Sequence, residues 1–205
     1  MDRFKRKTAI ALATAGLVAL TLGTTTIGAA PLAGNHIVPA STTVSGKSTS
    51  TVFSAGGIIV TCTNSVAGGK TPADGLSFAI KPLPSFNDGT STAPCTDSFG
   101  GTDTTVTTGK WSLKFLNPTE LEIVVPKAGA VVTNSLGCKI TLAPSKAYDV
   151  KAPGDYDGVS KLTLNIPTAG GLPVTVTGGL QCPVTAKTAS FKAVYTFTPG
   201  MADVS

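Results

Sequence analysis

The chain has 205 residues and a formal net charge of +5, with 16 lysines and arginines against 11 acids and a single histidine. Its only arginines are Arg3 and Arg6, so the rest of the chain has no guanidinium group to grip a phosphate bidentately. This composition argues against nucleic-acid binding, which needs clustered basic residues, and against chemistry that depends on histidine or arginine.

Residues 1–30 have the features of a secretory signal peptide. A positive segment, Arg3 to Lys7, precedes an uncharged apolar run from Thr8 to Leu22, and small residues follow up to Ala30. The run is shorter than the roughly 20 residues of a membrane-spanning helix, so a retained anchor is the weaker alternative. Cleavage after Ala29, Ala30 or Ala33 is left open. We expect a secreted, extracellular or cell-surface protein.

Removal of this segment changes the charge argument. Twelve lysines then face ten acids, and the lysines are scattered singly along the chain. The high isoelectric point therefore belongs largely to the export signal. No nucleic-acid partner is expected, and no membrane span remains after signal removal.

Residues 31–46 are expected to be a flexible lead-in, because they mix Pro, Gly, Ser and Thr without sustained periodicity. From residue 47 to residue 205 we expect a single domain. An alternative is two small stacked sandwiches, divided near Pro118 or Pro126.

The domain is dominated by Thr, Val and Ile and shows the period-two alternation of strands with one buried face. Alternation is clearest at residues 57–63, 109–116, 120–125, 138–142, 161–166 and 190–198. Gly- and Asn-rich turns separate these segments. About ten short strands indicate a sandwich or barrel. We expect an all-β fold, an antiparallel β-sandwich of the immunoglobulin-like or jelly-roll-like kind.

All four cysteines lie beyond the signal segment, and an even count in an exported chain predicts two disulfides. We favour Cys62 with Cys95 and Cys138 with Cys182, because each pair closes a local loop. The alternative joins Cys62 to Cys182 and Cys95 to Cys138. The spacings lack a C-x-x-C pair, so no zinc site is expected.

Few residues are suited to catalysis. The only histidine, His36, falls in the lead-in, and paired cysteines cannot act as nucleophiles. Glu120 and Glu122 share one face of a predicted strand, where paired carboxylates could run glycoside hydrolysis but more simply form a solvated face. The aspartates occur in turn-like contexts.

A calcium site is not expected either. Asp155-Tyr156-Asp157-Gly158 resembles the middle of a calcium-binding loop, but Pro153 and Leu164 occupy positions where that loop needs ligands. The simpler interpretation is a hairpin turn. No metal and no cofactor are predicted.

Binding residues are instead expected in two loops, 82–98 and 144–158. The first contains three prolines and ends near Cys95, and the second carries two tyrosines near turn residues. Trp111 alternates in phase with Leu113 and Phe115 and is expected in the core. The candidate binding residues are Phe86, Asn87, Asp88, Tyr148, Asp155, Tyr156 and Asp157.

Four short segments carry a resemblance: residues 60–65 (VTCTNS), 86–89 (FNDG), 94–98 (PCTDS) and 100–103 (GGTD). They resemble small secreted proteins of high-GC Gram-positive bacteria that carry no assigned function. These segments are cysteine and turn positions, so the resemblance implies an exported β-protein and transfers no catalytic residue.

The sequence therefore predicts a non-catalytic secreted or cell-envelope protein that acts by binding. The expected partners are a cell-wall polymer, another envelope protein or a host protein. Two other classes remain open: a hydrolase that uses carboxylates alone, and a secreted protease inhibitor that presents the loop 82–94.

Overall fold

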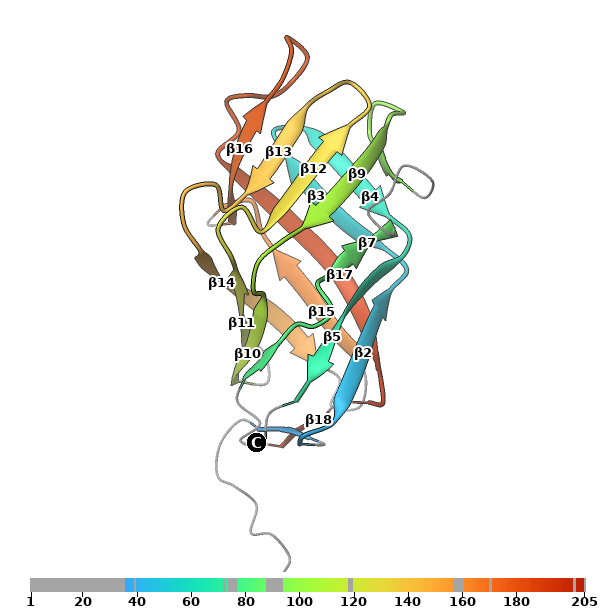
Figure 1. The fold of residues 1–205 in the computed structure, drawn as a ribbon, viewed down its shortest axis with the longest axis vertical. Helices are drawn as coiled ribbons and strands as arrows, with labels where there is room; N and C mark the ends of the chain where they lie inside the picture. Colours follow the sequence, from blue (N-terminus) through green and yellow to red (C-terminus); the bar gives the residue numbers. More distant parts are fainter. Residues whose placement is uncertain are drawn as a thin grey trace, which may run out of the picture. The chain divides into compact units, whose positions relative to one another are not determined.

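A computed structural model describes residues 36–38, 40–71, 73, 77–87, 94–117, 120–156, 161–169, 171–200 and 202–204 (Figure 1). The chain divides into two units, Met1–Ala30 and Pro31–Ser205, and all described residues belong to the second. The predicted signal peptide lies outside the described residues. Within those residues the chain forms eighteen strands and no helix, and accordingly none of them forms a helix able to cross a membrane.

Eight antiparallel strands close into a ring, which we call the first ring. Its order is β16-β13-β12-β9-β8-β4-β3-β17, and pairing of β16 with β17 completes the circle. The strands are β3 (Thr51–Ala55), β4 (Ile58–Cys62), β8 (Cys95–Asp97), β9 (Thr102–Thr107), β12 (Ala130–Asn134), β13 (Lys139–Leu142), β16 (Leu172–Thr177) and β17 (Thr188–Thr198). This ring occupies the upper part of Figure 1.

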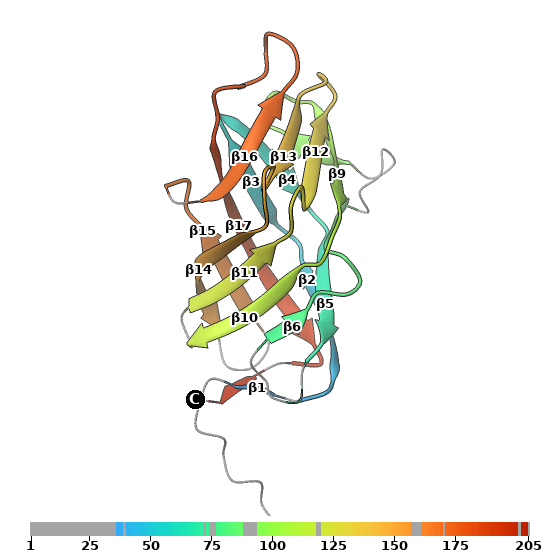
Figure 2. The same cartoon turned by 60° about the vertical axis from the view of Figure 1, so that its left-hand side comes forward.

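A second ring continues from the same long strand, β17. It runs from β17 through β15, β14, β11, β10 and β6, and returns through β5 and β2. A single bridge between Gly69 of β5 and Ile80, directly after β6, closes it. The added strands are β2 (Thr43–Ser48), β5 (Ser65–Lys70), β6 (Ser77–Ala79), β10 (Ser112–Asn117), β11 (Glu120–Val125), β14 (Tyr148–Tyr156) and β15 (Lys161–Ile166). Figure 2 shows these strands below the first ring.

Strand β17 is shared because it is long enough to pair twice along each edge. Its first part pairs with β3 and β16, and its later part pairs with β2 and β15. Along it Ala193, Tyr195 and Phe197 are buried while Lys192, Val194 and Thr196 are exposed. The alternation predicted for residues 190–198 is therefore confirmed from Ala193 onward. The buried side chains of β17 belong to a core that both rings share.

The expected flexible lead-in is wrong in part. Strand β2 begins at Thr43, within the expected lead-in. Strand β1 (His36–Val38) pairs with β18 (Ala202–Val204), the last strand of the chain that the structure describes. The segment 43–48 alternates exposed and buried positions, with Val44, Gly46 and Ser48 inward. The sequence pattern did not reveal this alternation, because two of the three inward residues are Gly and Ser, which are not hydrophobic.

The all-β, antiparallel prediction is confirmed, but the sandwich is wrong, and the described residues form eighteen strands instead of about ten. The strands of the first ring do not form two separate sheets, because pairing of β16 with β17 joins the two ends of their order. Closure removes exposed strand edges, which is the usual physical reason to prefer a barrel. Each ring also takes strands from both sides of residues 118–126, so neither ring is a contiguous half of the sequence.

Candidate functional site

An apolar cavity of about 100 Å³ lies where the interiors of the two rings meet. Its wall takes Val60 and Val132 from the first ring and Leu113 and Ile123 from the second. Six aromatic residues also line it: Phe53, Phe86, Trp111, Phe191, Tyr195 and Phe197. Inward-facing positions of many different strands thus converge on one space.

The cavity contains few polar groups. Thr51, Thr105 and Tyr195 are the hydroxyl-bearing residues of its wall. Burial raises the pKa of Tyr195 to about 12, so its phenol stays protonated at neutral pH. The Trp111 indole N–H is already used, since it donates to the Thr108 carbonyl at 3.0 Å. Such a wall suits an uncharged, apolar occupant.

Two carboxyl groups are buried inside the first ring. Asp97 ends β8 and Asp103 lies on β9, and they are 8% and 1% exposed. One Asp97 oxygen accepts the N–H groups of Phe99 and Gly101, both at 2.8 Å. Among the described residues, the other Asp97 oxygen and both Asp103 oxygens have no hydrogen-bond partner.

This pair is electrostatically unusual. Burial, and then the negative charge of Asp97, raise the pKa of Asp103 to about 7. Asn134 is paired in register with Asp103, and its Oδ1 accepts the N–H groups of Leu136 and Cys138. Its Nδ2 is buried and unpartnered. Burying a carboxyl group without a cation nearby costs less free energy when the group is protonated. No lysine of the described segments lies within 4.0 Å of either aspartate.

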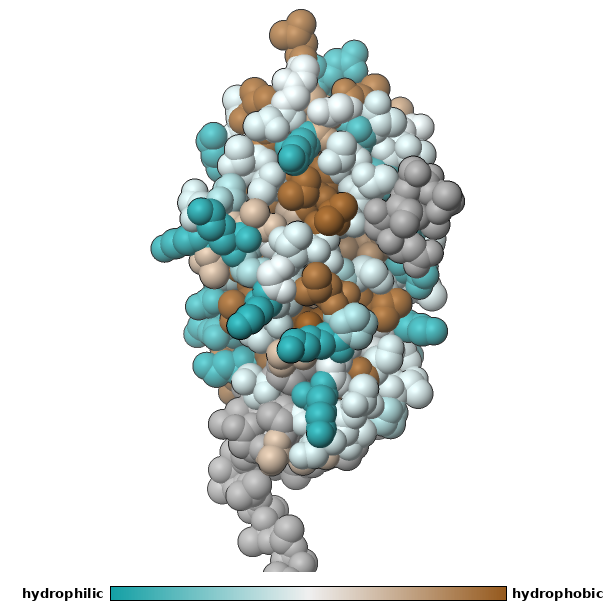
Figure 3. All heavy atoms as spheres, viewed as in Figure 1, coloured by the Kyte–Doolittle hydropathy of each residue, from teal (hydrophilic) through white to brown (hydrophobic). Residues whose placement is uncertain are grey.

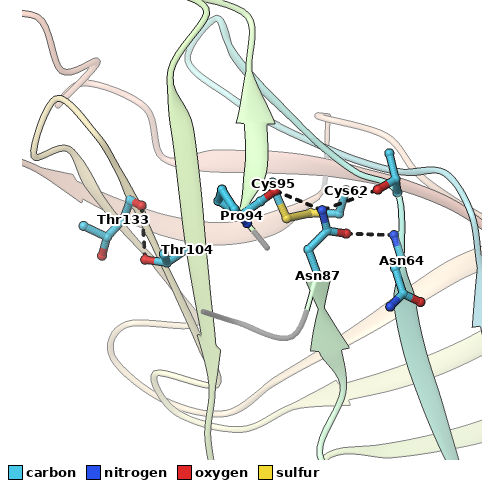
Figure 4. Close-up of a disulfide and its surroundings, with 8 residues drawn as sticks. Cys62, Asn64, Asn87, Pro94, Cys95, Thr104 and Thr133 are labelled. Atoms are coloured by element: carbon cyan, nitrogen blue, oxygen red, sulfur yellow. Dashed lines mark hydrogen bonds between the residues drawn. A yellow bond between two sulfur atoms is a disulfide. The ribbon is translucent and has the colours of Figure 1, made fainter. Parts of the chain in front are cut away.

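The two predicted disulfides, Cys62–Cys95 and Cys138–Cys182, are confirmed in the favoured pairing. The first joins the adjacent strands β4 and β8, with Cα atoms 4.5 Å apart (Figure 4). The second ties the start of β13 to the connection between β16 and β17. Both therefore cross-link the first ring, and disulfides of this kind are typical of extracellular proteins.

The predicted loop 82–98 is more structured than expected. It contains β7 (Ser85–Phe86) and β8, and Phe86 is half-buried against Phe191, with ring centroids 6.3 Å apart and nearly perpendicular planes. Asn87 is buried: its Oδ1 accepts the Asn64 N–H at 2.7 Å and its Nδ2 donates to the Pro94 carbonyl at 3.0 Å (Figure 4). Both side chains are thus packed into the fold instead of presented on a free loop, and Phe86 also lines the apolar cavity. Asp88 lies outside the described residues.

The second predicted loop is also largely a strand. Asp155 and Tyr156 belong to β14 and pair with Thr163 and Leu162 of β15. This antiparallel pairing of consecutive strands is what the hairpin interpretation expects, but the turn itself, with Asp157, lies outside the described residues. Tyr148 begins β14 and is half-buried against the core instead of presented at a loop surface.

The residues considered for catalysis lie on strands. His36 lies on β1, paired with Val204, not in a loose linker. Glu122 forms a 3.7 Å ion pair with Lys114 on the neighbouring strand β10. Glu120 belongs to the same strand as Glu122, and its side chain is outside the description. Trp111 lies in the core, as predicted.

Sequence reasoning missed Asp97 and Asp103 by assigning the aspartates to turns. The available signal was alternation: Asp97 lies two residues after Cys95, and Asp103 two residues before Thr105, so both share a strand face with a buried residue. Comparison with family models, curated proteins and solved structures finds no match to this chain. Any functional assignment therefore has to come from the cavity and the surface.

Proposed function

We propose that this chain is an exported, non-catalytic binding protein that holds a small apolar molecule, or the apolar end of a larger one, in the cavity between its two rings. The cavity and its aromatic wall are the observation that carries the proposal. Eight-stranded barrels either fill their interior with side chains or hold one small ligand there.

The size of the cavity limits the ligand. A dry cavity of roughly 150 Å³ accepts benzene or xenon, and the present one is about 100 Å³. We therefore expect a ligand portion of a few carbon atoms, with larger groups entering only if Phe or Trp side chains move. Charged ligand groups would remain outside, since the wall offers no cation.

Export is part of the same proposal. The predicted signal segment and the resemblance to secreted proteins of high-GC Gram-positive bacteria both support it, and two disulfides suit an oxidising environment. Binding to a cell-wall polymer, envelope protein or host protein would place the cavity at the cell surface. Amino-terminal sequencing of exported protein, with a new terminus near residue 30, would support this part of the proposal.

The structure gives less support to the two other protein classes considered, a hydrolase and a protease inhibitor. A carboxylate-dependent hydrolase would use Glu120, Glu122 or an aspartate of a turn. Glu122 is paired with Lys114, and the carboxyl groups of Asp97 and Asp103 are buried away from a solvent-borne substrate. An inhibitor would present residues 82–94 as free backbone. In this segment the Pro84 carbonyl already accepts a hydrogen bond from the Thr107 hydroxyl at 2.6 Å. The Asn87 side chain is hydrogen-bonded to Asn64 and Pro94, so these groups are not free to bind a protease.

The test is calorimetric and NMR titration of the mature protein with benzene and short alkanes. Ala130 is a buried residue of the cavity wall, so Ala130→Leu should fill part of the space and abolish binding. Val194→Leu is the matched control, because Val194 is exposed on β17. If both variants bind the probes as well as the wild type does, the cavity is not the binding site.

A further inference from the structure

The connections at one end of the first ring form a continuous rim. Four hairpin connections lie there: residues 56–57, 98–101, 135–138 and 178–187. We call these four segments the hairpin rim; they lie at the top of Figure 1. In an antiparallel ring alternate connections lie at the same end, so this grouping follows from the strand order.

A disulfide within the rim and hydrogen bonds at its base link the four segments. The Ser135 N–H donates to the Thr102 carbonyl at 2.8 Å, next to the segment 98–101. The disulfide Cys138–Cys182 joins the segments 135–138 and 178–187. The Ser98 N–H donates to the Ile59 carbonyl at 2.8 Å, close to the segment 56–57. The rim is therefore a fixed platform built on the closed ring.

This platform presents apolar side chains to solvent. Phe99 is 63% exposed, Leu136 51% and Val184 50%, while Leu180 is fully exposed. Each comes from a different turn or a separate point of the long connection, and glycines flank Phe99, Leu136 and Leu180. Figure 3 shows apolar side chains projecting at this end of the molecule. Four exposed apolar side chains at one end of the molecule make this end the candidate interaction surface.

The exposed charges at the rim are positive. No acidic residue occurs in the four rim segments, while Lys187 lies within the segment 178–187 and Lys139 directly follows the segment 135–138, and both lysines are exposed. The nearby carboxyl groups, Asp97 and Asp103, point into the ring and are buried. Described acids that reach solvent, such as Glu122 and Asp149, belong to strands of the second ring. The rim thus complements an anionic surface.

We propose that the hairpin rim docks the protein onto an anionic lipid surface, with Phe99, Leu136 and Leu180 inserted among the lipid headgroups and Lys139 and Lys187 at the level of the phosphates. Protruding, separate apolar tips suit a deformable lipid interface, whereas a protein partner would need a matching pit for each tip. Two lysines add electrostatic attraction to anionic lipids and make binding sensitive to salt. This inference does not depend on the cavity having a ligand.

The experiment is sedimentation of the mature protein with phosphatidylcholine vesicles, with and without phosphatidylglycerol. We expect binding to the anionic vesicles that weakens with added salt. The triple variant Phe99→Ser, Leu136→Ser, Leu180→Ser should bind roughly tenfold more weakly or worse. The matched control is Leu83→Ser, Val106→Ser, Val194→Ser, which removes three exposed apolar side chains outside the rim and should bind like the wild type.

A second readout reports insertion directly. In the Phe99→Trp variant, Trp111 stays buried, so the change in tryptophan emission on adding vesicles comes from position 99. A blue shift and quenching by brominated lipid are expected. The proposal is overturned if no vesicle binds, or if rim and control variants bind equally while both keep the wild-type melting temperature. Concentration-dependent dimerisation that the rim variant alone abolishes would also overturn it, because the rim would then be a self-association face.

Discussion

At the scale of single residues, the clearest departure from an ordinary core is Asp103. Its carboxyl group is almost fully buried beside a second carboxyl group, without a cation or hydrogen-bond donor to stabilise the charge. Burial followed by the charge of Asp97 raises its pKa from 3.8 to about 7. The native state therefore holds this proton more tightly than the unfolded chain does.

This difference predicts how stability depends on pH. The contribution from the Asp103 proton is fully present below about pH 4 and is lost as the pH rises to about 7, so the wild type loses stability across that interval. The loss is at most about 4 kcal/mol, from roughly three pKa units. Asp103→Asn should flatten this dependence and be more stable than the wild type at pH 8. Thermal unfolding from pH 4 to 8 checks this.

The exposed Asp149→Asn variant serves as the control, since it should keep the wild-type slope. Parallel curves for the wild type and Asp103→Asn would show that Asp103 has an ordinary pKa in the native state.

Asn87 gives a second prediction at this scale. Its amide links Asn64, two residues after Cys62, to Pro94, the residue before Cys95, so it reinforces the first disulfide by hydrogen bonds. Asn87→Ala should lower the free energy of unfolding by about 2–3 kcal/mol, because it leaves the Asn64 N–H and the Pro94 carbonyl without their partner. Urea denaturation measures this. Asn64→Ala, at an exposed side chain, should cost less than about 0.5 kcal/mol, and equal effects would contradict the assigned role.

At the scale of elements, both disulfides belong to the first ring. They close loops with sequence separations of 33 and 44 residues. The second ring has no cross-link among its described residues and closes through the single bridge between Gly69 and Ile80. The covalent links therefore reinforce the ring that carries the hairpin rim.

Removing either link should destabilise the fold by a similar amount. Chain-entropy arguments give about 4 kcal/mol for loops of these lengths, as an upper guide. We expect Cys62→Ala with Cys95→Ala, and separately Cys138→Ala with Cys182→Ala, each to lower the urea midpoint clearly. Complete reduction of the wild type should lower it further. An unchanged midpoint after reduction would show that the links do not contribute to stability.

The elements also show how far sequence alone could lead. Alternation located β4, β10, β11, β13, β15 and β17 because each places large apolar residues on one face and polar ones on the other. It did not locate the other described strands, among them β2, whose inward positions include Gly46 and Ser48, and β7, which has only two residues. Strand β14 falls largely where a loop was expected. Loop chemistry suggested surface roles for Phe86 and Asn87. Their burial depends on Phe191 and Pro94, and only the folded chain brings those residues together.

In the described unit as a whole, the architecture depends on one long strand, β17. Two rings share β17, so their interiors join at the cavity instead of forming two closed cores. Local patterns could not predict this arrangement, because the closing pairs β16–β17 and Gly69–Ile80 are matters of register and length, not of residue type. The cavity lies at that junction, where residues from both rings must fill one space.

Whether the junction of the two rings holds an apolar molecule can be seen in a crystal structure of the mature protein under xenon pressure. We expect a xenon atom in the space lined by Phe53, Trp111 and Tyr195, and none there in crystals of Ala130→Leu. A junction filled by side chains in the wild type, with xenon bound only elsewhere or not at all, would show that the junction is not a binding site.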